Sequence, residues 1–266
     1  MDRKGNVLAI MSAKGGTGKT STTANLALAL SNEFNKKILA IDTNISTASL
    51  AIHFGLDFEN KTIYDVLSFN YPIEATITKY NENLHIIPAS LKVFNLKENE
   101  KNLFLISDKI KKLADHYDIL LSQLVKKYDL VILDSAPGFS YESLATMKIA
   151  DGVLFVTNPD YPSLIATTKA EAYAKKMEVP MGGLVLTKIT NKNYELSVNQ
   201  IEKLVGAQII AEIPEDKNLP ESIAKGIPLV NYKTHSQASI SYKELAGRLV
   251  GEKYDKTLLE SLKTLF

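Results

Sequence analysis

The sequence contains no cysteine at any of its 266 positions. This absence excludes disulfide bonds, thiolate zinc sites, cysteine-ligated iron–sulfur clusters and cysteine nucleophiles. A chain without cysteine is also well suited to a reducing compartment, and we expect a cytoplasmic location.

Long hydrophobic runs are absent as well. The longest apolar runs, such as Val7–Met11, are about a quarter of the ~20 residues that a membrane span needs. This run is also too short for the hydrophobic core of a secretory signal, although Arg3 and Lys4 precede it. We therefore expect no membrane span, and any contact with a membrane would be peripheral.

The chain has no excess of charge of one sign and very little arginine. It has 31 basic and 30 acidic residues, so its net charge of +1 creates no general attraction to nucleic acid or to anionic membranes. Arg3 and Arg248 are its two arginines, so bidentate recognition of phosphates or bases by arginine is nearly excluded. Phosphate groups must be neutralised by lysine, backbone amides or a metal ion.

Short apolar runs alternate with helical patterns along the chain. The runs show little apolar–polar alternation, which is typical of strands buried on both faces of a parallel sheet. We predict one α/β domain over residues 1–250, an open, mostly parallel sheet flanked by helices. The predicted strands are Val7–Met11, Ile38–Ile41, Leu84–Ile87, Leu130–Leu133, Val153–Val156, Leu184–Leu186 and Ile209–Ile213, and the predicted helices are Lys19–Glu33, Thr62–Phe69, Ser107–Lys127, Ser163–Glu178 and Ser197–Val205.

A glycine-rich loop follows the first predicted strand and opens the first predicted helix. Residues 13–21 read Ala-Lys-Gly-Gly-Thr-Gly-Lys-Thr-Ser. Such glycines allow backbone N–H groups to surround phosphate oxygens at the positive end of a helix. Lys19 would place its charge on the β- and γ-phosphates, and the hydroxyl of Thr20 suits Mg²⁺. The expected phosphate-binding residues are Gly15, Gly16, Thr17, Gly18, Lys19, Thr20 and Ser21.

Two aspartates follow predicted strands, Asp42 after Ile38–Ile41 and Asp134 after Leu130–Leu133. Ligands bind at the carboxyl ends of the strands in open α/β sheets. We expect Asp134 to hold Mg²⁺ through water and Asp42 to be a second carboxylate near the metal. The structural alternative for Asp134 is that its side chain only caps a turn.

Lys14, ahead of Gly-Gly-Thr-Gly-Lys-Thr, is the signature of the deviant Walker A ATPases, and the sequence resembles the MinD/ParA family from Val7 to about Val250. It is most like the archaeal MinD-type proteins. The resemblance implies an ATPase of the deviant Walker A P-loop fold that binds ATP or ADP with Mg²⁺. It also implies a nucleotide-sandwich homodimer in which Lys14 reaches the phosphates of the partner. Further matching segments are 132–138, 156–160, 213–216 and 224–230.

The sequence departs from the family pattern at Asn44. The family usually carries Asp-x-Asp after the second strand, and its second aspartate helps to position the attacking water, whereas this chain has Asp42-Thr43-Asn44. Asparagine is a poor proton acceptor, so we expect normal ATP binding and slow hydrolysis. The alternatives are that another residue aligns the water, or that Asn44 is an engineered substitution that traps the ATP state.

The resemblance also implies a base-binding region formed by Asn158, Thr187, Pro214, Glu215 and Asp216, which all follow predicted strands. Thr187 stands where the family often has asparagine. The structural alternative for this region is that its residues only form turns between elements. His53 is expected to be a surface or packing residue.

A C-terminal tail, 251–266, is predicted to contain an amphipathic helix over Lys253–Phe266, with Lys256, Glu260 and Lys263 on its polar side. Such a helix either touches a membrane, as in MinD-like proteins, or packs on the surface of the protein itself.

Three functions fit these observations. The first is a MinD-type ATPase switch that positions partner proteins, with a regulatory or cargo protein that the sequence does not identify. The second is a ParA-like ATPase that coats DNA, which is less expected because residues 217–266 hold eight basic and five acidic residues. The third is an ATP-bound scaffold that does not hydrolyse.

Overall fold

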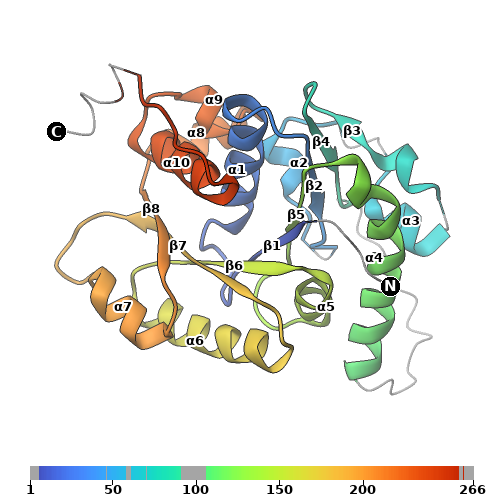
Figure 1. Cartoon of the computed structure of the whole chain (residues 1–266), viewed down its shortest axis with the longest axis horizontal. Coiled ribbons are helices and arrows are strands. Elements are labelled where there is room, and N and C mark those ends of the chain that lie inside the picture. Colours follow the sequence, from blue (N-terminus) through green and yellow to red (C-terminus); the bar gives the residue numbers. More distant parts are fainter. Residues whose placement is uncertain are drawn as a thin grey trace.

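The computed structural model describes residues 6–45, 47–57, 61–69, 71–90, 106–257 and 260. Within this part of the chain, eight strands form one sheet in the order β3-β4-β2-β5-β1-β6-β7-β8 (Figure 1). Neighbouring strands are parallel, except that β3 is antiparallel to β4. The strands are β1 (Val7–Met11), β2 (Ile38–Asp42), β3 (Thr78–Lys79), β4 (Leu84–Ile87), β5 (Leu130–Asp134), β6 (Gly152–Thr157), β7 (Met181–Ile189) and β8 (Ile209–Pro214).

The predicted α/β class and all seven predicted strands are confirmed. β7 is longer at both ends than the predicted Leu184–Leu186. The additional strand β3 has two residues and pairs only with β4, so its sequence offers too short a pattern for a prediction.

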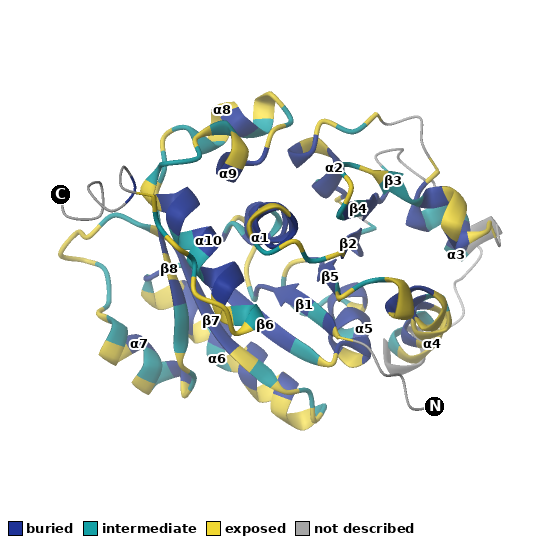
Figure 2. Ribbon diagram, turned by 45° about the horizontal axis from the view of Figure 1, so that its top comes forward, coloured by how far each residue is buried: buried dark blue, intermediate teal, exposed yellow. Residues whose placement is uncertain are grey.

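Helices cover both faces of the sheet (Figure 2). The central helix α1 and the C-terminal helix α10 pack on one face together with α2, α8 and α9, and α4 to α7 pack on the other face. The helices are α1 (Lys19–Glu33), α2 (Leu50–His53), α3 (Ile63–Phe69), α4 (Ile106–Leu124), α5 (Tyr141–Ile149), α6 (Tyr161–Lys176), α7 (Val198–Val205), α8 (Leu219–Ala224), α9 (Leu229–Tyr232) and α10 (Gln237–Val250), with 3₁₀ turns η1 (Ile73–Thr76) and η2 (Val125–Lys127).

Each central strand contributes to two hydrophobic cores because successive side chains point to opposite faces of the sheet. In β1, Ala9 and Met11 pack toward α4 to α7, whereas Ile10 packs toward α1 and α10. All three are almost completely buried. Burying an isoleucine-sized side chain contributes about 1.5–3 kcal/mol, so the two cores fix the position of the strand ends that carry the polar residues.

The five predicted helices are present with small shifts of their ends, and Lys19–Glu33 coincides with α1. The predicted Ser107–Lys127 divides into α4 and η2. Helices α5, α8, α9 and α10 were not predicted, and the two longest of them are α5 and α10. Both bury small or polar residues, such as Thr146 in α5 and Ser239 in α10, which weakens their apolar periodicity.

The first part of the predicted C-terminal helix is not helical, because residues 252–257 contain no helix or strand. Glu260 is helical, and residues 258, 259 and 261–266 lie outside the described part, so the rest of the helix stays a prediction. Glu260, expected on an exposed polar side, is completely buried and accepts from Lys243 Nζ at 3.2 Å and from the hydroxyl of Tyr254 at 2.9 Å. These contacts attach the beginning of the tail to α10. None of the described helices is long and apolar enough to cross a membrane.

Candidate functional site

The glycine-rich loop lies at the carboxyl edge of the sheet, between β1 and α1. Two residues of the loop, Gly16 and Gly18, have positive φ angles of 77° and 90°, which favour glycine over residues with a Cβ. No atom lies within 4 Å of where a Cβ would stand on Gly15 or Gly16, so the outer side of the loop is open. No side chain among the described residues caps the first turn of α1. Its free N–H groups therefore form a site for an anion.

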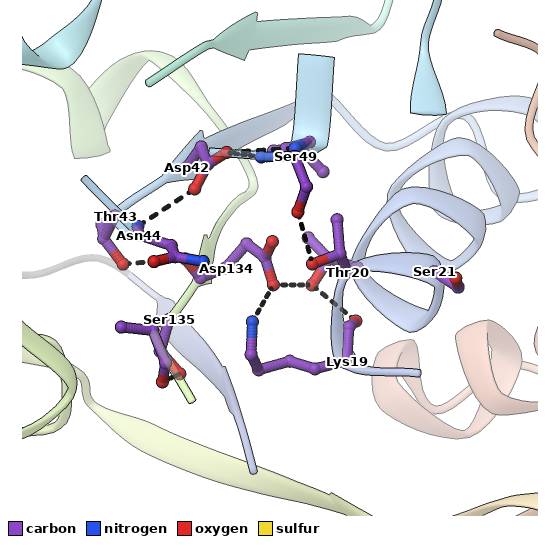
Figure 3. A network of polar contacts seen from close by, with 12 residues as sticks. Lys19, Thr20, Ser21, Asp42, Thr43, Asn44, Ser49, Asp134 and Ser135 are labelled. Atoms are coloured by element: carbon purple, nitrogen blue, oxygen red, sulfur yellow. Dashed lines mark hydrogen bonds and ion pairs between the residues drawn. The ribbon is translucent and has the colours of Figure 1, made fainter. Parts of the chain in front are cut away.

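The catalytic lysine candidate is held by a buried carboxylate (Figure 3). Lys19 Nζ lies 2.9 Å from Asp134 Oδ1, and both side chains are nearly inaccessible to solvent. Thr23 Oγ1 donates to the same oxygen at 3.1 Å. The other oxygen, Asp134 Oδ2, is buried and has no hydrogen-bond partner. A buried carboxylate oxygen without a donor is costly, so it is a natural point of attachment for a cation or water.

Asp42 and Asp134 occupy paired positions on β2 and β5, which run side by side. Burial and the neighbouring Asp134 raise the pKa of Asp42 to about 7, although its oxygens accept from the N–H groups of Asn44, Ser49 and Leu50 at 3.0 Å each. A divalent cation beside the two carboxylates would favour their ionised forms. One or two carboxylates with a hydroxyl are a typical protein contribution to a Mg²⁺ site, so Asp42, Asp134 and Thr20 fit this metal.

The side chain of Asn44 is buried at the wall of the site and forms hydrogen bonds with Thr47. Its Nδ2 donates at 2.8 Å to both the carbonyl and the hydroxyl oxygen of Thr47, and its Oδ1 accepts from the Thr47 N–H at 3.2 Å. Asn44 therefore closes a small loop just after β2. The amide donor is used for this purpose, which an aspartate could not do.

Two residues that sequence reasoning missed lie on α2 and its N-terminal cap. Ser49 Oγ is 3.2 Å from Thr20 Oγ1, and His53 Nε2 is 3.1 Å from Ser21 Oγ. His53 is buried, as expected of a packing residue, but it also contacts the first turn of α1. Burial lowers the pKa of His53. The four-residue spacing of Ser49 and His53 was the available signal, because it places both on one side of a helix.

Two residues at the carboxyl end of β7 form hydrogen bonds with the backbone of the glycine-rich loop. Thr187 Oγ1 donates to the carbonyl of Thr17, and Asn158 Nδ2 donates to both oxygens of Thr187 at 3.0 Å. Lys188 Nζ donates to the carbonyl of Gly16 at 2.7 Å. In this structure Thr187 holds the phosphate loop in place and Asn158 holds Thr187, and their contact with a base stays a prediction.

A cavity of about 640 Å³ extends from the loop to the beginning of α8. Asp42 and Asp134 are buried beneath it, Asn158 lies behind Thr187, and Lys14 is exposed at the tip of the loop. The end near α8 is largely apolar, as a base requires, with Leu219, Pro220 and Ile223 in its wall. Predicted residues in the wall are Gly15, Gly16, Thr17, Gly18, Lys19, Thr20, Ser21, Asn44, Thr187, Pro214, Glu215 and Asp216.

The polar groups at the far end are partly engaged by the protein itself. Asp216 accepts from the backbone N–H of Asn218 at 2.8 Å, and although burial opposes ionisation, hydrogen bonds from Ser236 and Asn218 lower the pKa of Asp216. The backbone N–H of Glu215 donates to the carbonyl of Ile189. Asp216 thus stabilises its own turn as well as lining the cavity.

Two family models match the chain. An AAA domain model matches residues 5–178, and a model of the 4Fe-4S iron sulfur cluster binding proteins of the NifH/frxC family matches residues 109–260. Since the chain has no cysteine, the second match concerns the shared fold and not cysteine ligation of a cluster.

Individual relatives agree with these models over nearly the whole chain. An uncharacterised ATP-binding protein of Methanocaldococcus jannaschii is 33% identical, over 94% of this chain and 90% of its own length. The septum site-determining protein MinD of Helicobacter pylori is 30% identical, over 98% and 96%. The structure of MinD from Pyrococcus horikoshii in complex with Mg-ADP is 29% identical, has a TM-score of 0.80, and covers 92% of this chain and 95% of its own. The chain belongs to the MinD/ParA family of deviant Walker A P-loop ATPases.

Proposed function

We propose that this chain is a MinD-type switch that binds Mg-ATP, forms a nucleotide-sandwich homodimer, hydrolyses ATP slowly and positions partner proteins. The observation that carries the proposal is the buried Lys19–Asp134 pair at the mouth of an anion-binding loop, with one carboxylate oxygen left without a partner. The loop, the pair and the apolar far end lie along one cavity of suitable size for a nucleotide.

Each part of the cavity has a separate task in this proposal. The backbone of Gly15 to Gly18 and the ammonium group of Lys19 bind the phosphates, and Thr20, Asp42 and Asp134 hold the metal. When bound, Mg²⁺ supplies positive charge to the β- and γ-phosphate oxygens. Because Lys19 now pairs with Asp134, binding of phosphate and metal would exchange this internal pair for two contacts with the ligand.

Lys14 is the residue that we assign to the partner subunit's nucleotide. Its side chain is exposed at the open tip of the loop, so it is free to reach another molecule. Of the two arginines, Arg248 is engaged within the chain, because it donates to the carbonyl of Ile210 at 2.7 Å. A lysine from the second copy would then neutralise charge as the phosphates react.

The dimer is tested by measuring nucleotide affinity and molar mass in the presence of Mg-ATP or Mg-ADP. We expect the unmodified chain to bind both nucleotides and to form a dimer with ATP. Lys14→Ala should bind ATP with similar affinity and stay monomeric, whereas the control Lys111→Ala, which removes an exposed lysine on α4, should dimerise normally. A chain that binds ATP but stays monomeric contradicts the switch, and a dimeric Lys14→Ala contradicts the assigned role of Lys14.

The slow turnover that we propose rests on Asn44, whose amide is engaged with Thr47 and offers no carboxylate for the attacking water. If hydrolysis is blocked rather than slow, the protein would act as an ATP-bound scaffold. Tight retention of intact ATP after many hours with Mg²⁺ would support the scaffold, and release of phosphate in a single turnover would support the switch.

The C-terminal region gives more support to a protein-directed switch than to coating of DNA. Lys225, Lys243 and Lys256 pair with Glu221, Glu260 and Glu244 at 2.7–3.2 Å, so three of the eight basic residues of 217–266 are paired within the protein. For the tail itself, the buried position of Glu260 supports packing on α10 over contact with a membrane. Sedimentation with anionic vesicles in the ATP state would test the membrane alternative.

A further inference from the structure

The first turn of α1 carries two hydroxyls that face the nucleotide cavity, and α2 and its cap contact both of them. Ser49 Oγ lies 3.2 Å from Thr20 Oγ1, and His53 Nε2 lies 3.1 Å from Ser21 Oγ. Thr20 and Ser21 line the cavity. Residues 49 and 53 are one helical turn apart, so one side of α2 holds the two hydroxyls.

The direction of the bond between Ser21 and His53 follows from the other ring nitrogen. His53 Nδ1 lies 3.0 Å from the carbonyl oxygen of Ser49, and a carbonyl oxygen only accepts, so Nδ1 carries the hydrogen. In the neutral ring that burial favours, Nε2 then has a free lone pair and accepts from the Ser21 hydroxyl. The single proton of Ser21 Oγ is therefore directed at His53 and not into the cavity.

This direction matters because phosphate oxygens accept hydrogen bonds and donate none at neutral pH. With its proton on His53, the hydroxyl of Ser21 presents only lone pairs to an anion in the loop. To donate to a phosphate oxygen the hydroxyl must rotate, and the buried Nε2 of His53 then loses its donor. Leaving the buried Nε2 without a donor should weaken the binding of the phosphate group by about 5- to 100-fold.

We propose that His53 is a positioning residue that makes docking of α2 and binding of a phosphate group at Ser21 compete for the same hydroxyl proton. Without nucleotide, His53 holds this proton and α2 is fixed to α1. With nucleotide, Ser21 donates to a phosphate oxygen and α2 is released from this contact. The inference rests on the proposed nucleotide site. It adds His53 as the residue that links phosphate binding to α2.

The test is calorimetric titration with ADP of the full chain and four variants. His53→Leu removes the acceptor and should bind ADP about 5- to 50-fold more tightly, because Ser21 no longer has a competing partner. His53→Gln keeps an acceptor oxygen and should stay within about threefold of the unmodified chain. In the Ser21→Ala background, adding His53→Leu should change the affinity little, since the contested proton is gone.

Hydrogen exchange of residues 49–57 gives a second readout that does not depend on affinity. In the unmodified chain the exchange should become faster when ADP binds, and in Ser21→Ala it should be fast already without ADP. The Ser21→Ala measurement decides the question even if His53→Leu does not fold.

Equal or weaker binding of ADP by His53→Leu overturns the inference, as does a gain in affinity that persists without Ser21. Slower exchange of 49–57 on binding also overturns it. Failure of the unmodified chain to bind ADP contradicts the proposed function itself, so the two failures are distinguishable.

Discussion

Replacing Asn44 by aspartate restores the carboxylate that the family pattern places two residues after Asp42, and its effect on stability can be worked from the structure. The amide of Asn44 donates to the carbonyl and the hydroxyl of Thr47 at 2.8 Å and accepts from the Thr47 N–H at 3.2 Å. Aspartate keeps the accepting oxygen, loses the donor, and turns a negative oxygen toward the Thr47 carbonyl.

The expected loss of stability has two parts. The Thr47 hydroxyl can donate to the aspartate, as it can to Asn44 Oδ1 at 3.0 Å, so only the bond to the Thr47 carbonyl is lost, at a cost of about 0.5–1.5 kcal/mol. A third carboxylate near Asp42 and Asp134 adds about 1 kcal/mol of repulsion at this buried edge. A total of about 2 kcal/mol should lower the Tm of the nucleotide-free protein by about 4–8 °C. Mg-ATP should reduce this difference, because the metal neutralises the added charge.

The rate of ATP hydrolysis should rise in the same variant, although its stability falls. If Asn44 slows hydrolysis by failing to position the water, Asn44→Asp should accelerate a single turnover at saturating Mg-ATP at least about tenfold. The matched control is Asn44→Ala, which also loses the contacts with Thr47 but supplies no carboxylate. Equal rates for Asn44→Asp and the unmodified chain would refute the role of Asn44, and equal acceleration by both variants would show that a loosened loop, and not the carboxylate, is the cause.

Three further predictions concern stability. Lys19→Met leaves Asp134 buried without its cation and should lower the nucleotide-free unfolding free energy by about 3 kcal/mol in urea titrations; a loss under about 1 kcal/mol would contradict a tight pair. Burial opposes ionisation of Glu260, but its hydrogen bonds lower its pKa to about 2, below the unfolded value of 4.5. The ionised side chain therefore contributes about 3 kcal/mol to the free energy of unfolding above about pH 4.5, and this contribution is lost as the pH falls through 2. Acid titration of Glu260→Gln should lack that part of the pH dependence; an unchanged acid profile would contradict it. Gly226→Ala should cost more than Gly206→Ala in Tm, because both have φ above 60° but a Cβ has room only at Gly206; equal losses would contradict the close backbone contact at Gly226.

Much of the fold could be predicted because its signals are local. Continuous apolar runs such as Leu130–Leu133 indicate buried parallel strands wherever they lie in the sheet, and the loop before Lys19 combines glycines with a strand and a helix in fixed order. The helix α10 gave no such signal. It buries Ser239 and Lys243, the latter paired with Glu260, so its hidden face is partly polar.

In the candidate site, too, local features could be predicted from the sequence and contacts between distant residues could not. Position along the chain was enough to predict that Asp42 and Asp134 each follow a strand at the carboxyl edge of the sheet, and the loop residues were predicted from their spacing alone. The partners of these residues could not be predicted: Lys19 pairs with Asp134 115 residues away, and Thr187 supports Thr17 across 170 residues. Nothing in the local sequence of either residue specifies the other.

The sequence by itself therefore determined the class of fold, the phosphate loop and the unusual Asn44, because strand burial, glycine conformation and side-chain chemistry are properties of single residues and short segments. The tertiary structure alone decided the strand order, the pairing of Lys19 with Asp134, and the contact of His53 with Ser21. These depend on which segments the packing of two cores brings together, and the energy of that packing is shared among many distant residues.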